Sequence, residues 1–384
     1  MSLPRRSLLR AASGALALVP LGGVTVLRAA DPDPLAPWAE APRAAAHPDP
    51  RIRALSWAVL APNPHNRQPW IAELPAAAPD TVVLRCDLDR RLPVTDPFDR
   101  QITIGLGAFA ELCRLAAAEE GRAVAVSPFP EGEPGPRLDG RPVAILRFGA
   151  PGSAAPDPLF RQAAARRSAK RPYDTARPVA AESLAALGRV VAAPVRFGGT
   201  TDPDRVATIR DIAWRSWQIE ATTEAAHLES VNLMRFGRTG VAANPDGISV
   251  WGPGIEEGVA AGQITRESML PGGAGYRFMI ERYAPMLAAT PAYVWLTTGR
   301  GRADQLAAGR DWLRVNLAAT AAGLSVHPLS QALQEFPEVA GPYAEMHGAL
   351  APDGATVQML ARLGYAAPVP PTPRWPVETR IRAV

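Results

Sequence analysis

The alternation of hydrophobic and polar positions predicts helices and strands in two successive sets. The first set has helices at 51–60 and 102–121 and strands at 81–87, 123–129 and 142–149. After a connector at 151–158, the second set has helices at 158–168, 202–226 and 303–322, with strands at 194–198, 292–298 and 324–328. This mixture of helices and strands predicts an α+β protein.

A repeated pattern links two of the predicted helices. Gly107 and Gly309 each stand eight residues before the sequence Leu-Ala-Ala, and a further glycine follows, Gly121 or Gly323. The two copies are offset by 202 residues throughout. The repeat predicts two related halves in one chain, arranged as the subunits of a dimer would be.

The first copy also contains Gly105, Gly107 and Ala110, which match a dinucleotide-binding spacing. The apolar run before them is very short, and Gly309 has no such neighbours in the second copy. We interpret these glycines as sites of helix packing.

A segment of different composition lies within the second half, at about 228–285. It contains the glycine- and proline-rich stretches NPDGISVWGPG and LPGGAGY, and it shows no stable periodicity. Its apolar side chains are Trp251, Met269, Tyr276 and Phe278. A long irregular segment of this kind is usually functional, and we expect a lid. Within it, Pro245-Asp246-Gly247 is interpreted as a turn.

Charge and cysteine content exclude several classes of protein. The net charge is +4, and no long run of like charge indicates a nucleic-acid partner. The histidines His65, His227, His327 and His347 are widely spaced, so no metal site is predicted. Two cysteines, Cys86 and Cys113, are too few for a disulfide scaffold, although one disulfide between them stays open for an exported protein.

The N-terminus has the features of an export signal. Arg5 and Arg6 precede a mildly apolar stretch that Pro20 interrupts. This resembles a twin-arginine signal, which we place at 1–30, with a linker at 31–50. We therefore expect the twin-arginine export machinery as a partner and a periplasmic or other extracytoplasmic location, with cleavage of the signal left open. The route carries folded proteins, often with a cofactor already bound.

The stretch APNPHNRQPW, at 61–70, predicts a rigid loop. Its three prolines exclude a regular helix or a central strand. Asn63, Asn66 and Gln68 supply side-chain amides beside Trp70. A stiff loop rich in amides can bind a flat ring with polar edges.

A basic segment, ARRSAKRPYD, follows the connector. Arg166, Arg167, Ser168 and Lys170 place charged donors and a hydroxyl together, as a phosphate requires, and Lys170 is the one lysine of the chain. The alternative is a solvated basic helix end that the helix dipole favours.

Together, the loop and the basic segment resemble the nitroreductase-like flavoprotein family, within it the Acg-like branch of fused, single-chain members. The resemblance continues at 306–331 and 363–378, and it spans most of 51–380. It implies a nitroreductase-like fold as a pseudo-dimer within one chain, with a first half at 51–150, a second half at 158–380 and FMN as the cofactor. One site per chain is expected, because the first half has no basic segment after the signal and the second half has no counterpart of the loop.

The resemblance also implies roles for eleven residues. Those expected to bind the isoalloxazine or ribityl part of FMN are Asn63, Asn66 and Gln68. Those expected to bind its phosphate are Arg166, Arg167, Ser168, Lys170 and Arg374. Those expected near its reactive N5 edge are Pro328, Leu329 and Ser330. The chain departs from the family pattern at Asn63, where serine is common, at Arg67, where threonine is usual, and at Trp375, where a second arginine is common.

The activity implied is electron transfer through flavin N5 to a nitroaromatic, a quinone or a similar small acceptor. No catalytic acid, base or nucleophile is assigned, and a monomer is expected. An alternative of another class is a catalytically silent FMN-binding protein that sequesters or senses the flavin under a lid. Scarcity of NAD(P)H outside the cytoplasm and the glycine-rich segment at 228–285 both favour this alternative.

Overall fold

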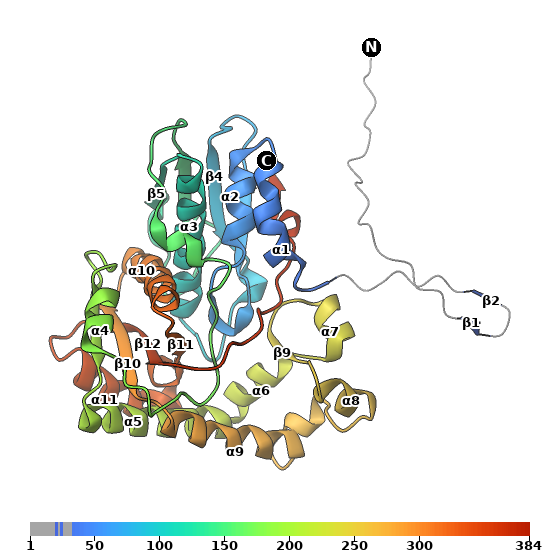
Figure 1. Cartoon of the computed structure of the whole chain (residues 1–384), viewed down its shortest axis with the longest axis vertical. Helices are drawn as coiled ribbons and strands as arrows, with labels where there is room; N and C mark the ends of the chain where they lie inside the picture. Colours follow the sequence, from blue (N-terminus) through green and yellow to red (C-terminus); the bar gives the residue numbers. More distant parts are fainter. Residues whose placement is uncertain (1–19, 22–23, 26–32) are drawn as a thin grey trace.

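The computed structural model describes residues 20–21, 24–25 and 33–384 of the chain. The arginine pair of the predicted export signal lies outside these residues. Two short strands, β1 (Pro20–Leu21) and β2 (Val24–Thr25), pair in antiparallel orientation. Figure 1 shows the remainder as two stacked parts, with helix α10 between them.

The first part is built on a five-stranded sheet with the order β13-β3-β4-β6-β5. Its strands are β3 (Trp70–Leu74), β4 (Thr81–Cys86), β5 (Val124–Pro128), β6 (Ala144–Phe148) and β13 (Ile381–Ala383). The strands β3 to β6 are antiparallel neighbours, whereas the C-terminal strand β13 joins β3 in parallel. The end of the chain therefore completes the sheet of the first part.

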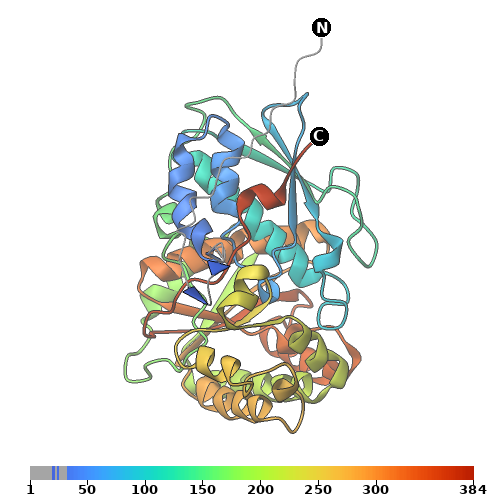
Figure 2. The ribbon, with the colours of Figure 1, turned by 90° about the vertical axis from the view of Figure 1, so that its right-hand side faces the viewer.

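The second part is built on a four-stranded antiparallel sheet with the order β7-β10-β12-β11. Its strands are β7 (Arg196–Thr200), β10 (Ala292–Thr298), β11 (Ser325–Pro328) and β12 (Thr356–Gly364). Helices α4 (Ala181–Gly188) and α10 (Arg302–Ala321) share a core with one face of this sheet. Helices α5 (Pro203–Thr222), α9 (Ala274–Ala288) and α11 (Ala340–Leu350) pack on the other face (Figure 2).

The two parts share one topology. In chain order the strands are β3, β4, β5, β6 in the first part and β7, β10, β11, β12 in the second, and in both sheets they are arranged first-second-fourth-third. Helix α3 (Arg100–Glu119) precedes the third strand of the first sheet, and α10 precedes that of the second. The bounds of the two helices are offset by 202 residues at both ends, as the sequence repeat predicts.

Helices α3 and α10 cross where the repeated glycines meet. A Cβ on Gly107 would collide with the carbonyl oxygen of Leu306, and a Cβ on Gly309 would collide with that of Ile104. The two collisions are related by the same offset of 202 residues. These glycines therefore permit a close crossing of two helix backbones, and the interpretation of Gly107 as a packing glycine is confirmed.

Helix α3 is long and apolar enough to span a membrane by length and composition. However, 94% of its apolar window is buried inside the protein. The helix packs on α2 (Pro50–Ala58), on the first sheet and on three leucines of α10. It is therefore the central core helix, which explains its apolar composition.

Two expected helices need correction. Residues 158–168 do not form an α-helix: a 3-10 helix at Pro158–Gln162 is followed by turns and an extended segment. The helix expected at 202–226 is divided at Thr223, which lies between α5 and α6 (Glu224–Asn232). Three strands of the two sheets, β3, β12 and β13, were not predicted.

The segment 228–285 is mostly ordered secondary structure, contrary to its irregular sequence pattern. Beyond α6 it contains β8 (Met234–Phe236), α7 (Gly237–Ala243), β9 (Ile248–Val250), α8 (Ile255–Ala260) and most of α9. Strands β8 and β9 pair in parallel, and they are connected by α7 and the turn at 244–247. We refer to 228–285 as the insertion. Outside it, the remaining α-helix of the described residues is α1 (Ala36–Arg43), which packs on α2, so the segment expected to be a linker at 31–50 is partly helical.

Candidate cofactor site

The loop at 61–70 has an unusual backbone. His65, Asn66 and Gln68 have φ values of 46°, 51° and 51°, in the left-handed region that side chains other than asparagine and aspartate rarely adopt. The Oδ1 atom of Asn63 accepts a hydrogen bond from the backbone nitrogen of Gln68 at 2.7 Å and closes the loop. Asn63 also packs on Gly105 of α3, where a Cβ would lie 3.1 Å from the Asn63 Cβ. The loop is therefore a rigid, strained structure anchored on the core helix.

Two amides of the loop hold the C-terminal segment that crosses from the second part to the first. Asn66 Nδ2 donates to the Pro373 carbonyl at 3.0 Å, and Asn66 Oδ1 accepts from Arg374 Nη1 at 2.6 Å. Gln68 Oε1 accepts from the backbone nitrogen of Trp375 at 2.9 Å. Gln68 is fully buried, with 0% of its surface exposed. Its side chain therefore binds the crossing segment and presents no surface to a ligand.

Two buried arginines meet at the start of the loop. Arg166 Nη2 donates to the Leu60 carbonyl at 3.2 Å, and Arg374 Nη2 donates to the same carbonyl at 3.3 Å. Burial and the nearby Arg167 lower the pKa of Arg166 to about 10. Burial, Arg166 and Arg167 hold the pKa of Arg374 well below its ordinary value. The face of Trp38 lies 4.5 Å from the Arg167 guanidinium and 5.6 Å from that of Arg374.

The charge of this cluster is not balanced within the described residues. The side chains of Arg166, Arg167 and Arg374 donate to backbone carbonyls, to the Asn66 amide and to the Thr372 hydroxyl, and within the described residues none of the three forms an ion pair with a carboxylate. Arg374 Nε and His65 Nδ1 are buried atoms without a hydrogen-bond partner in the described part of the chain. Buried cations are ordinarily paired, so the donor set fits a bound anion such as a phosphate.

The basic segment runs beside the second sheet. Ser168 forms a parallel bridge with Val326 of β11, and the Ala169 nitrogen donates to the Val326 carbonyl at 2.9 Å. Because of this pairing, the basic residues are extended and do not continue the helix expected at 158–168. It brings Ser168 and Lys170 next to the end of β11, where Pro328 and Ser330 lie.

Lys170 combines an exposed side chain with a lowered pKa. Surrounding protein atoms are the main cause that lowers the pKa, while Glu220 raises it. Burial, Lys170 and Arg67 lower the pKa of His65 to about 4. Burial, Lys170 and Arg362 likewise lower that of His327.

The structure thus brings together the loop at 61–70, the basic segment, the end of β11 and the C-terminal segment. Their residues differ in the exposure of their side chains. Those with accessible surface are Asn63, Asn66, Arg167, Ser168, Lys170, Pro328 and Ser330. Those buried behind them are Gln68, Arg166, Leu329 and Arg374. Direct contact with a ligand stays a prediction for all eleven residues, and the first group is the more accessible to a ligand.

Sequence reasoning missed Asp246. Although it stands in a turn, it is buried, and it accepts from arginines of the loop and its surroundings: Arg67, Arg90 and Arg235. A Pro-Asp-Gly sequence is typical of an exposed turn, so no local signal distinguishes it. Only the spatial convergence of three arginines reveals its role.

Two of the residues expected to anchor a lid, Met269 and Tyr276, are bonded to helices α6 and α5. The Met269 carbonyl lies 2.7 Å from His227 Nε2, and the Tyr276 hydroxyl donates to the Ala221 carbonyl at 3.3 Å. Phe278 is 54% exposed. The contacts of the insertion with the loop at 61–70 are made instead by Pro245, Asp246 and Gly247.

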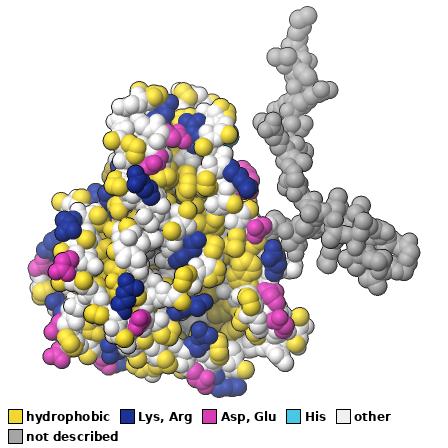
Figure 3. Space-filling model, viewed as in Figure 1, with side chains coloured by type: hydrophobic (Ala, Val, Ile, Leu, Met, Phe, Trp, Pro, Cys, Tyr) yellow, Lys and Arg dark blue, Asp and Glu magenta, His cyan; other side chains and the backbone are white. Residues whose placement is uncertain are grey.

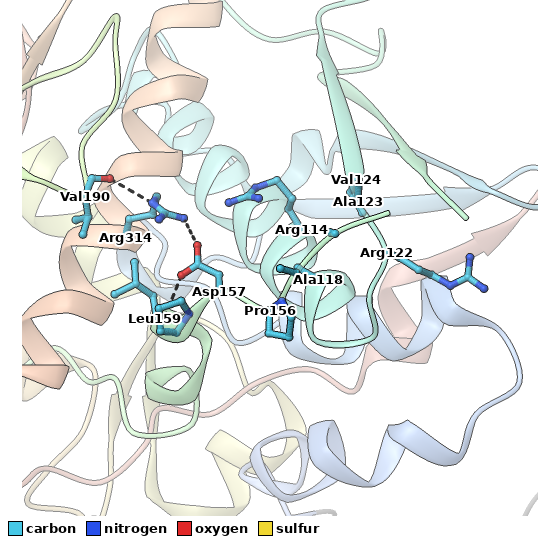
Figure 4. A pocket seen from close by; sticks show the side chains of 13 residues that line it. Arg114, Ala118, Arg122, Ala123, Val124, Pro156, Asp157, Leu159, Val190 and Arg314 are labelled. Carbon is cyan, nitrogen blue, oxygen red and sulfur yellow. Dashed lines mark hydrogen bonds and ion pairs between the residues drawn. The ribbon is translucent and has the colours of Figure 1, made fainter. Parts of the chain in front are cut away.

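Other features lie away from this site. Figure 3 shows basic and acidic side chains interspersed over one face of the protein. A surface cavity of about 510 Å³ lies beside Arg114, Asp157 and Arg314, where Asp157 and Arg314 form an ion pair at 2.9 Å (Figure 4). It shares no residue with the cluster above.

Cys86 and Cys113 are buried free thiols. Residues 33–384 contain no group of three or more His, Cys, Asp or Glu side chains placed to hold a metal ion.

The fold and the site define an α+β protein of two topologically equivalent parts with a buried cationic cluster at their junction. No family model matches the chain. It is 28% identical over 340 residues to the Mycobacterium tuberculosis protein named "Putative NAD(P)H nitroreductase Rv3131", a match that covers 84% of this chain and 91% of that protein. The chain is thus a distant homologue of this nitroreductase-like protein over most of its length.

Two solved structures match about half of the chain at low identity. A nitroreductase with bound FMN from Bacteroides fragilis is 17% identical, with a TM-score of 0.33, and the match covers 55% of this chain and 89% of that one. A BluB-like flavoprotein from Clostridium difficile is 13% identical, with a TM-score of 0.36, and the match covers 58% of this chain and 97% of that one.

Proposed function

We propose that the protein is an FMN-dependent oxidoreductase of the nitroreductase type, in which one chain takes the place of a dimer. The observation that carries the proposal is the buried cationic cluster at the junction of the two parts. The name of the Mycobacterium tuberculosis homologue supports the same reaction class. The small-molecule acceptor would be a nitroaromatic, a quinone or a related compound.

The cluster has the donors that a phosphate monoester needs. Arg167, Ser168 and Lys170 would contact the phosphate, and the buried Arg166 and Arg374 would add positive potential from behind. Asn63 and Asn66 would border the ribityl chain or the ring, whose reactive edge would lie toward Pro328 and Ser330. When bound, FMN supplies hydride transfer at N5, and the protein supplies orientation, hydrogen bonds and exclusion of water.

A second candidate is a catalytically silent protein that sequesters or senses FMN. The observation that favours it is the bonding of the insertion to the loop, since Gln68 Nε2 donates to the Pro245 carbonyl at 2.6 Å. An insertion fixed in this way restricts access to a bound ring from its side of the site. Export by the twin-arginine route would also separate the protein from NAD(P)H in the cytoplasm, and we include this location in the proposal.

The test is an anaerobic visible spectrum of the protein purified with FMN, before and after addition of NADPH. A flavin spectrum that NADPH bleaches supports the oxidoreductase. A flavin spectrum that only dithionite bleaches supports the silent protein or another donor. A colourless protein that does not retain FMN refutes both.

Charge variants make the test specific for the cluster. We expect the double variant Arg167→Gln/Lys170→Gln to lose about 10-fold or more in FMN affinity, because two charge-assisted hydrogen bonds are removed. Arg161→Gln is the matched control, since Arg161 is an exposed arginine on the preceding turn. Equal FMN affinity in the double variant and the control would contradict the assignment of the phosphate position.

A further inference from the structure

Three residues of the insertion are bonded to three residues of the loop at 61–70. The Pro245 carbonyl accepts from Gln68 Nε2 at 2.6 Å, and the Gly247 nitrogen donates to the Asn66 carbonyl at 3.1 Å. Between them, Asp246 Oδ2 lies 3.3 Å from Arg67 Nη1. Three consecutive residues of the insertion therefore hold three consecutive residues of the loop, in antiparallel order.

Asp246 is the acidic centre of this contact. Besides Arg67, its carboxylate binds Arg90 Nη1 at 2.7 Å and Arg235 Nη2 at 3.1 Å. Only 6% of its surface is exposed. The other nearby acid is Asp87, which binds Arg90 at 3.0 Å and Arg380 at 3.4 Å. Four arginines thus share two carboxylates, and loss of Asp246 would leave Arg67, Arg90 and Arg235 close together without their common counter-charge.

The turn that presents Asp246 has a fixed shape. Gly247 has a φ of 74°, and a Cβ at this position would collide with the Leu233 carbonyl oxygen. The pairing of β9 with β8 holds the residues directly after the turn, and Arg235 of β8 binds Asp246. The turn at 245–247, which we call the clamp, is therefore held by contacts within the insertion in addition to its contacts with the loop.

The loop, in contrast, needs external support. His65, Asn66 and Gln68 occupy the left-handed region, and such residues persist only when surrounding contacts over-determine them. One side of the loop is held by α3 and by the crossing segment at 373–375. The clamp supplies the support on the other side.

We propose that Asp246 is a positioning residue that, through Arg67, holds the loop at 66–68 in the conformation that receives FMN. The insertion then stabilises the conformation of the loop at 61–70, in addition to any covering of the flavin ring. This inference rests on the proposed function for its ligand, but the state of the loop can be measured without FMN.

The experiment measures hydrogen–deuterium exchange of residues 62–70 in the full-length FMN-free protein, together with the Kd for FMN. In Asp246→Asn we expect exchange at 64–68 to increase by about 10-fold or more and FMN affinity to fall by a similar factor, because loss of one partner of a buried charge pair ordinarily costs more than a factor of about ten. Exchange in the strands of both sheets should be unchanged. Asp211→Asn is the control, because Asp211 forms an exposed ion pair with Arg215.

Two further variants separate positioning from general destabilisation. Arg67→Gln removes the ion pair between the loop and Asp246, together with the hydrogen bonds of Arg67 to the Arg90 and Asp89 carbonyls, without stranding three arginines. It should therefore fold even where Asp246→Asn does not, and it should raise exchange at 64–68 in the same way. Asp246→Glu keeps the charge and should restore part of the FMN affinity.

Unchanged exchange at 64–68 in both Asp246→Asn and Arg67→Gln would overturn the inference, even if the parent protein binds FMN. Exchange that rises equally throughout both sheets would also overturn it, since it indicates a merely structural role. Failure of the parent protein to bind FMN would refute the proposed function. Increased exchange at 64–68 in the variants would still show that Asp246 stabilises the conformation of the loop.

Discussion

His65 shows how one residue of the loop can couple stability to pH. Its folded-state pKa is about 4, below the ordinary value of 6.5, because of burial and the charges of Lys170 and Arg67. The unfolded chain therefore binds more protons than the folded chain between these pH values. The contribution of His65 to stability is present above pH 6.5 and is lost as pH falls toward 4, by at most about 3 kcal/mol.

We predict that His65→Asn reduces this acid sensitivity, since asparagine tolerates the φ of 46° and does not titrate. The measurement is the free energy of unfolding in urea at several pH values between 7 and 4. His327 is present in both proteins, so its own titration cancels in the comparison. Equal slopes for the parent and the variant would show that the imidazole of His65 is solvated in the folded protein.

The sequence indicates which residues gather at the junction of the two parts, but it does not indicate which of them are buried and which are accessible. The loop and the basic segment stand out in the sequence because prolines, amides and the one lysine are locally unusual. Gln68, however, bonds to Trp375, 307 residues away, and no local pattern reports such a contact. Asp246 was missed for the same reason, since its arginine partners Arg67 and Arg90 precede it by more than 150 residues.

Among the elements, the crossing of α3 and α10 gives a direct test. We predict that Gly309→Ala lowers the free energy of unfolding by about 1–3 kcal/mol or more, because the added methyl meets a backbone carbonyl that cannot move aside. Gly348→Ala in α11 is the matched control, since nothing lies within 4 Å of the added Cβ. There the change should stabilise by about 0.5–1 kcal/mol, the ordinary preference of a helix for alanine. Urea denaturation measures both, and a neutral Gly309→Ala would contradict the close crossing.

Elements with a continuous apolar pattern were predicted well, and those shaped by tertiary contacts were not. Strand β10 and helices α3 and α10 occur within two residues of their predicted bounds. Strand β12 escaped prediction although it is almost wholly buried, and its Arg362 is satisfied inside the protein by Thr290 and other acceptors. The alanine-rich stretch before Ser168 favours a helix locally, but pairing with β11 prevails there.

At the scale of the whole molecule, the two parts share a topology but differ in the connection that precedes the sheet. Residues 59–69 join α2 to β3, whereas 189–195 join α4 to β7 with a shorter sequence, RVVAAPV, that has no side-chain amide. The basic segment belongs to the second part alone. The first part thus supplies the amide-rich loop, and the second part supplies the basic segment.

We therefore predict one FMN per chain at saturation and a monomer in solution. Titration calorimetry gives the stoichiometry, and light scattering during size-exclusion chromatography gives the mass. Two flavins per chain would mean that the short connection at 189–195 also forms a site. A dimer that binds FMN only when associated would contradict the complete site that one chain presents.

The meeting of Gly107 with Gly309 also affects how such a protein can change by mutation. In an assembly of two identical chains, a single codon specifies both residues at a twofold axis, so each substitution acts twice and must be tolerated on both sides. Here separate codons encode the two glycines, and a substitution on one side leaves the other intact. The connections at 59–69 and 189–195 are likewise encoded separately, so each can change without the other. One side of the molecule can therefore be refined for a ligand while selection on the other retains only its packing.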